Sequence, residues 1–151
     1  MNQSVNHKHI FDAANDLRIG SEILESKFGE PVFPLRSTVV TAAFAAELYL
    51  KCLLYVCGKD VPRGRDGHNL KTLYEALGND LQQKVETHFK ESVHGTQTIR
   101  ALTEEFQNTF NDWRYIYEKQ SNTFLLLNFK SLRTLVQVLD KSVREMKPEW
   151  K

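Results

Sequence analysis

The chain has 151 residues, a length that predicts one domain over residues 1–151 with frayed tails at about 1–7 and 148–151. Apolar residues make up 41% and charged residues 26% of the sequence, as in globular proteins that bury a substantial core. The formal net charge of +1 excludes a global basic field for nucleic acid and an acidic solvating tail, so nucleic acid would have to meet a local patch.

The first part of the chain predicts two long helices. Apolar residues at helical spacing indicate a first helix over about 8–28, and Pro31 and Pro34 in GEPVFPLR then interrupt the pattern. Ser37 is a suitable N-cap for the second helix, which should end at Gly58. The segment GKDVPRGRDG that follows is rich in glycine and charge and indicates a loop.

Two shorter helices are predicted next. The third covers about 69–77 and ends at Gly78, and Asn79 can cap the fourth, which Gly95 ends. The apolar stripe of the fourth helix is Leu81, Val85, Phe89 and Val93.

The last third of the chain predicts a fifth helix capped by Thr96 and a sixth that begins near Asn122 or Thr123. The short link at 119–123 makes these two helices an antiparallel pair. The stripe of the fifth is Ile99, Leu102, Phe106, Phe110, Trp113 and Tyr117, and that of the sixth is Leu125, Phe129, Leu132, Val136, Leu139, Val143 and Met146. No long alternation of apolar and polar residues indicates a strand, so the sequence predicts an all-α, up-and-down bundle of five to six helices.

The second helix should be the centre of this bundle, because TVVTAAFAAELYLKCLLYVC is apolar on nearly every face. Its charged residues Glu47 and Lys51 argue against a membrane span and need either a partner or a wet cleft. Cys52 and Cys57 are five residues apart, a spacing that turns their side chains away from each other on a helix. With no apolar leader in MNQSVNHKH, a reduced cytoplasmic protein is expected.

A second charged pair, Arg114 and Glu118, lies among the aromatic residues of FNDWRYIYEK on the fifth helix. We expect the two pairs to share one polar cluster where the helices cross, with Glu47 holding Arg114. Two interpretations stay open. One is a buried network that only fixes packing; the other is a cleft lined by Glu47, Lys51, Arg114 and Tyr117.

Three stretches of the chain resemble the HEPN superfamily of prokaryotic helical proteins. They are AAELYLKCLLYVCGK at 45–59, GHNLKTLYEAL at 67–77, and FNDWRYIYEK at 110–119. The resemblance implies a helical bundle that is often a homodimer. It also implies a link to metal-independent ribonucleases of toxin–antitoxin, phage-defence and RNA-targeting systems, whose arginine is followed four to six residues later by a histidine in a cleft shared by two subunits.

By position Arg114 matches the motif arginine, and its guanidinium could hold a phosphate. No histidine follows Arg114 before the chain ends. The leading hypothesis is therefore a non-catalytic accessory or regulatory module. It would bind a partner protein or a nucleotide or RNA ligand in a groove between the second and fifth helices, lined by Glu47, Lys51, Arg114 and Tyr117.

Two other hypotheses stay open. The chain could be a metal-independent endoribonuclease with a non-standard site, in which Arg114 meets the phosphate and Tyr117, Glu118 or His68 moves protons. It could also be a purely structural dimerisation domain.

The remaining candidates lie in the loop before the third helix. Its basic residues Lys59, Arg63 and Arg65 form the best local patch, and His68 can orient the loop at the helix N-terminus. No cluster of cysteines and histidines has the spacing of a metal site, and no cofactor fingerprint is present in the sequence. We expect a cytoplasmic homodimer without metal, cofactor or membrane contact.

Overall fold

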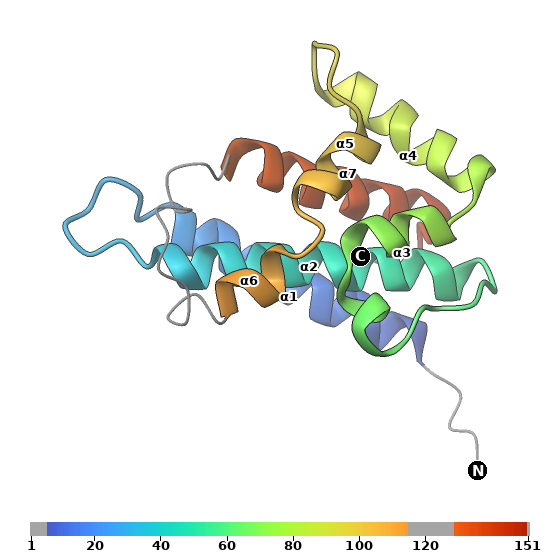
Figure 1. Cartoon of the computed structure of the whole chain (residues 1–151), viewed down its shortest axis with the longest axis horizontal. Helices are drawn as coiled ribbons and strands as arrows, with labels where there is room; N and C mark the ends of the chain where they lie inside the picture. The colour runs from blue at the N-terminus through green and yellow to red at the C-terminus, as the bar shows by residue number, and fades with distance from the viewer. Residues whose placement is uncertain (1–5, 115–128, 151) are drawn as a thin grey trace.

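A computed structural model describes residues 6–114 and 129–150 of the chain. These residues form helices and no strand, which confirms the predicted all-α helical bundle (Figure 1). The α-helices are α1 (His7–Glu25), α2 (Leu35–Val56), α3 (Leu70–Ala76), α4 (Asn79–Ser92), α5 (Ile99–Glu105), α6 (Thr109–Arg114) and α7 (Phe129–Met146), and a 3₁₀ helix, η1 (Gly64–His68), precedes α3.

Helix α2 lies at the centre of the fold, with α1, α3, α6 and α7 packed around it (Figure 1). Its alanines Ala43, Ala45 and Ala46 have no exposed surface, which lets the neighbouring helices approach closely. Among the described helices, α2 alone is long and apolar enough to cross a membrane by length and composition, and 61% of its most apolar window is buried inside the fold. Such burial is typical of the core helix of a globular domain.

Helix α1 is shorter than predicted. It ends at Glu25, and turns follow in which Lys27 N–H donates to Leu24 O at 3.1 Å and Phe28 N–H donates to Glu25 O at 2.9 Å. Phe28, at the end of the predicted range of about 8–28, therefore lies outside the helix and is exposed.

The start of α2 also differs from the prediction. Ser37 is not its N-cap, because the helix begins at Leu35 and the Pro34 carbonyl accepts a hydrogen bond from Thr38 N–H at 3.0 Å. Proline suits this place, since its fixed φ fits a helix start and its missing N–H costs nothing there. The predicted end at Gly58 is confirmed, with a φ of +64° immediately after the last turn.

Asn79 is likewise the first residue of α4 rather than its cap. Gly78 occupies the N-cap position with a φ of +76°, a left-handed conformation that favours glycine. One glycine therefore ends α3, as predicted, and opens α4.

The predicted fifth helix is two helices, α5 and α6, and its cap is Thr98 rather than Thr96. A hydrogen bond from outside the helix lies at the break, at 106–108. Gln107 O accepts the N–H of Leu70, at the start of α3, with an N···O distance of 3.1 Å. The turn between α5 and α6 is therefore tied to α3.

The apolar stripes are buried largely as predicted. Buried members are Leu81, Val85, Phe89, Ile99, Leu102, Phe106, Trp113, Leu132, Val136, Leu139 and Val143. Helix α7 packs on α2, α4 and α5. The predicted start of the sixth helix and its link to the fifth lie outside the described residues.

A polar network joins α1, α2 and α7 inside the bundle. Asp140 on α7 accepts a hydrogen bond from Arg144 Nε at 2.9 Å, and its other carboxylate oxygen lies 3.7 Å from Arg18 Nε. Asn15 Oδ1 accepts from both arginines, at 2.9 and 3.0 Å. Burial, with Asp140 beside it, raises the pKa of Tyr49 well above its usual range. The network ties the first and last described helices to each other.

The two cysteines are free thiols, as expected, and they differ in accessibility. Cys52 is fully buried, and burial raises the pKa of its thiol to about 12, whereas Cys57 is only partly buried. Since the thiolate is the reactive form, we expect a thiol reagent at about pH 8 to modify Cys57 first and Cys52 only after unfolding. Labelling with a chromogenic disulfide, in buffer and in denaturant, measures this. Fast labelling of the native Cys57→Ser variant would contradict it.

Candidate functional site

The candidate site is built around the carboxylate of Glu47, in the middle of α2. Glu47 is only 1% exposed. Its Oε1 accepts a hydrogen bond from Lys51 Nζ at 2.6 Å and lies 3.1 Å from His68 Nδ1. Its Oε2 is buried and has no hydrogen-bond partner among the described side chains. The lysine thus neutralises a charge that burial would otherwise make very costly.

The contact with Glu47 defines the state of His68. Because a carboxylate only accepts hydrogen bonds, Nδ1 carries the proton, and in the neutral ring Nε2 is then a free acceptor. The side chain of His68 is 46% exposed, and Nε2 contacts no hydrogen-bond partner in the described part of the chain. The ring is therefore anchored on one side by a buried acid and open to solvent on the other.

Local sequence explains how η1 presents this histidine. A Cβ atom on Gly67 would lie 2.7 Å from Pro62 O, so only glycine permits the close approach that places His68. On the other side, Asn69 caps α3 by accepting from Thr72 N–H at 3.0 Å.

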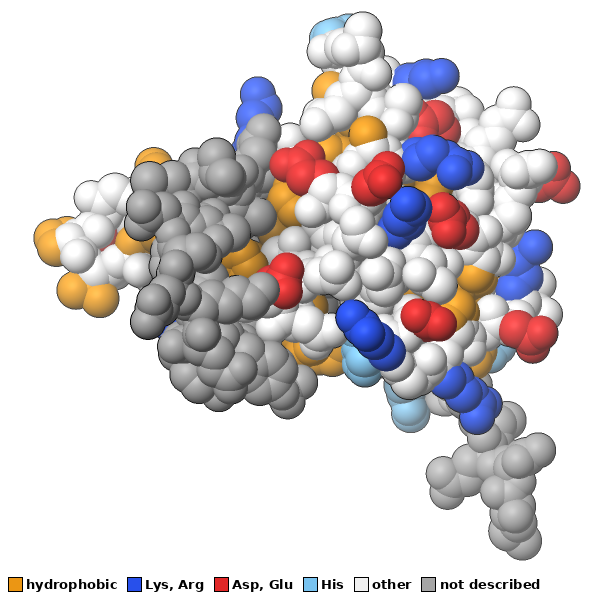
Figure 2. Space-filling model, in the orientation of Figure 1, with side chains coloured by type: hydrophobic (Ala, Val, Ile, Leu, Met, Phe, Trp, Pro, Cys, Tyr) orange, Lys and Arg blue, Asp and Glu red, His pale blue; other side chains and the backbone are white. Residues whose placement is uncertain are grey.

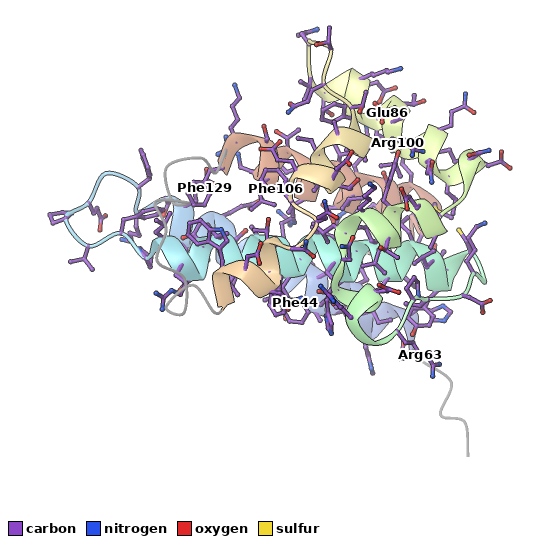
Figure 3. The ribbon with its side chains drawn as sticks, viewed as in Figure 1. Phe44, Arg63, Glu86, Arg100, Phe106 and Phe129 are labelled. Carbon is purple, nitrogen blue, oxygen red and sulfur yellow. The ribbon has the colours of Figure 1, made fainter. Side chains whose placement is uncertain are left out.

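Aromatic rings from two further elements lie beside His68. Phe110 on α6 stacks with the His68 ring at a centroid distance of 6.4 Å and lies 4.9 Å from the ring of Phe44 on α2. Both phenylalanines are partly exposed. Phe44 and Arg63 are labelled in Figure 3. We call the surface formed by Phe44, Lys51, His68 and Phe110, with Glu47 buried beneath it, the His68 face.

Of the sequence-predicted binding residues, the structure brings together Glu47 and Lys51. Arg114 ends α6, but its side chain, and all of Tyr117 and Glu118, lie outside what the structure describes, so the expected contact between Glu47 and Arg114 stays a prediction.

The predicted basic loop runs directly into the His68 face. Its residues Lys59, Arg63 and Arg65 are exposed and precede His68 in the chain. Figure 2 shows histidine side chains next to lysine and arginine side chains along the lower edge of the molecule.

The histidine–carboxylate contact and the ring of Phe44 are the parts that sequence reasoning missed. The acid inside an apolar helix and the Gly-His pair were the available signals. Phe44 lies in a helix that is apolar on every face, so periodicity could not separate it from the core.

A second histidine has a packing role. His88 Nδ1 on α4 lies 3.0 Å from Ser142 Oγ, and its Nε2 lies 2.5 Å from Glu145 Oε2, both on α7. The Ser142 hydroxyl is buried and donates to Val138 O, so it is not a free nucleophile. The described residues contain no group of three or more metal-binding side chains.

Comparison with known proteins adds no relative. The chain matches no family model, no curated protein and no solved structure. The HEPN resemblance therefore rests on the three sequence stretches alone.

Proposed function

We propose that the chain is a non-catalytic accessory module that binds a nucleotide or single-stranded RNA at the His68 face. The observation that carries the proposal is the buried Glu47, which holds the half-exposed His68 ring beside Phe110 at one surface. A buried acid is unfavourable for the folding of an otherwise apolar core helix. A role in orienting the His68 imidazole toward a ligand would explain why Glu47 is present.

The chemistry of the face fits nucleotides. Aromatic and imidazole rings stack on bases of any sequence, at roughly 1–3 kcal/mol per base. The cations of Arg63, on the adjoining loop, and of Arg65, in η1, are exposed and suit phosphate oxygens. A chain whose overall charge is only +1 would depend on such a local patch.

A metal-independent ribonuclease is the second candidate, and the Glu47–His68 contact favours it. A carboxylate that fixes the Nδ1 proton leaves Nε2 able to take a proton from a ribose 2′-hydroxyl. The second candidate needs a cation on the scissile phosphate as well, and Arg114 is the residue that the HEPN resemblance assigns to that role. Because the motif histidine is missing, we rank the ribonuclease below the non-catalytic binding module.

The test is a binding and cleavage assay with fluorescently labelled single-stranded RNA in chelator. We expect His68→Ala to weaken binding about tenfold, which corresponds to about 1.4 kcal/mol, and the RNA to stay intact. His94→Ala is the matched control, because His94 is exposed on the segment between α4 and α5.

The other outcomes are equally clear. RNA affinity that is undetectable, or equal in wild type and His68→Ala, would refute the proposal. Cleavage that both His68→Ala and Arg114→Ala abolish would establish the ribonuclease instead.

A further inference from the structure

A polar pocket lies between α3, α4 and α5, apart from the His68 face. Its volume is about 450 Å³, within the range of roughly 300–1,000 Å³ that is typical of small-molecule sites. Its described lining is polar apart from the ring of Tyr74, and it includes Glu86 and Lys90 of α4 and Arg100 of α5. Figure 2 shows side chains of both charges gathered over these three helices, and Glu86 and Arg100 are labelled in Figure 3. The pocket shares no residue with the His68 face.

The carboxylate of Glu86 has a hydrogen-bond partner for only one of its two oxygens. Its Oε2 accepts the N–H of Ile99, the first residue of α5, at 3.0 Å. Its Oε1 is buried, and no group in the described part of the chain donates a hydrogen bond to it. A buried carboxylate oxygen without a donor is costly, so the capping of α5 alone does not explain this acid. A ligand with an N–H donor supplies the missing hydrogen bond.

The guanidinium of Arg100 lacks an acid. Its Nη2 donates to Gln82 Oε1 at 3.0 Å, which leaves its other donors without a described partner. Arg100 is exposed and forms no ion pair with any carboxylate that the structure describes, Glu86 included. Lys90, also exposed, likewise pairs with no acid within the described ranges. The pocket therefore offers cations to an anionic group.

Tyr74 shows that the acid and the guanidinium act at the same place. Burial raises the pKa of its phenol to about 12, and Glu86 shifts that pKa further upward while Arg100 shifts it downward. Both groups therefore lie near the Tyr74 hydroxyl without neutralising each other in a direct ion pair. Opposite charges that face one pocket from two helices fit a ligand that carries both charges itself. They suit a polyanion less well, since Glu86 repels phosphates.

We propose that this pocket binds a free α-amino acid. The ammonium group of the ligand donates to Glu86 Oε1, and its carboxylate binds Arg100, with Lys90 as a second cation. The side-chain amides of Asn79 and Gln83, which are exposed and line the same pocket, suit a polar side chain on the ligand. Such a ligand bridges α4 and α5. The proposal does not depend on the function proposed for the His68 face.

The experiment measures binding of amino acids to the full chain. Thermal shift with each standard L-amino acid, supplied separately at millimolar concentration, identifies the best ligand, and isothermal titration calorimetry gives its dissociation constant. We expect a polar amino acid to bind. Its N-acetyl derivative lacks the ammonium group and its carboxamide derivative lacks the carboxylate, so each should bind at least about tenfold more weakly.

Two variants assign the contacts. Glu86→Gln keeps an oxygen for the Ile99 N–H, and we expect it to bind the amino acid about tenfold more weakly but the N-acetyl derivative as wild type does. Arg100→Met removes an exposed side chain, and should weaken binding of the amino acid but not of the carboxamide. Arg36→Met, at an exposed position of α2 outside the pocket, is the control and should bind like wild type.

Absence of binding by every amino acid at these concentrations would overturn the proposal. Equal affinities for the amino acid and its two derivatives, or a loss in Arg36→Met as large as in Arg100→Met, would also overturn it. Inorganic phosphate that binds more tightly than any amino acid, and loses affinity in Arg100→Met, would assign the pocket to a simple anion instead.

Discussion

Replacing Asp140 by alanine is expected to lower the free energy of unfolding by about 2 kcal/mol, within the range for leaving a partly buried polar group without its partner. Asp140 is the acid that faces both Arg18 and Arg144 between α1 and α7. Without it, Arg144 loses its counter-charge, whereas Arg18 keeps a carboxylate partner, because Glu22 Oε1 lies 2.8 Å from Arg18 Nη1. Urea unfolding followed by circular dichroism measures the change.

Tyr49→Phe is the matched control for Asp140→Ala. The Tyr49 hydroxyl is buried beside the same network and makes no hydrogen bond of good geometry, so its removal should cost less than about 1 kcal/mol. Equal losses in the two variants would show that packing around the network, and not the charge of Asp140, holds α1 on α7.

Replacing Glu47 by methionine is expected to have the opposite profile: a change in unfolding free energy within about 1 kcal/mol and a loss of RNA affinity of about tenfold. Burial of this carboxylate is already costly, since Oε2 has no hydrogen-bond partner in the part of the chain that the structure describes. Its two partners can turn to water when it is removed, because the side chains of Lys51 and His68 are 20% and 46% exposed. Methionine fills a similar volume in the core.

Glu47→Gln separates charge from shape in the same experiment. The amide oxygen can still accept from His68, so we expect weaker binding than wild type but stronger binding than in Glu47→Met. A methionine variant that unfolds easily while the folded fraction binds RNA normally would show that Glu47 serves packing only.

The fold class could be predicted because the apolar stripes of this chain are long and regular. Leu132, Val136, Leu139 and Val143 of α7 are buried as their spacing required. The division of the fifth helix could not be predicted, and the hydrogen bond found at the break joins residues 70 and 107, far apart in the chain. Helix propensity carries no information about such a contact.

The candidate site was predictable only in part, for a related reason. A charge inside an apolar helix must have a partner, so the importance of Glu47 could be read from sequence. The partner of Glu47 depends on how η1 folds against α2. The close approach of Gly67 to Pro62 is part of that arrangement, and the sequence shows a glycine there without showing the approach.

The hydrogen bond from Leu70 to Gln107 has a consequence for how this protein can vary. It joins the start of α3 to the break before α6, and the Asn69 side chain adds contacts of 3.4 and 3.3 Å to Gln107 and Asn108. These contacts with Gln107 and Asn108 therefore fix the position of His68 relative to Phe110. A residue inserted after Asp60, which is exposed, is therefore expected to leave the spacing of His68 and Phe110 unchanged.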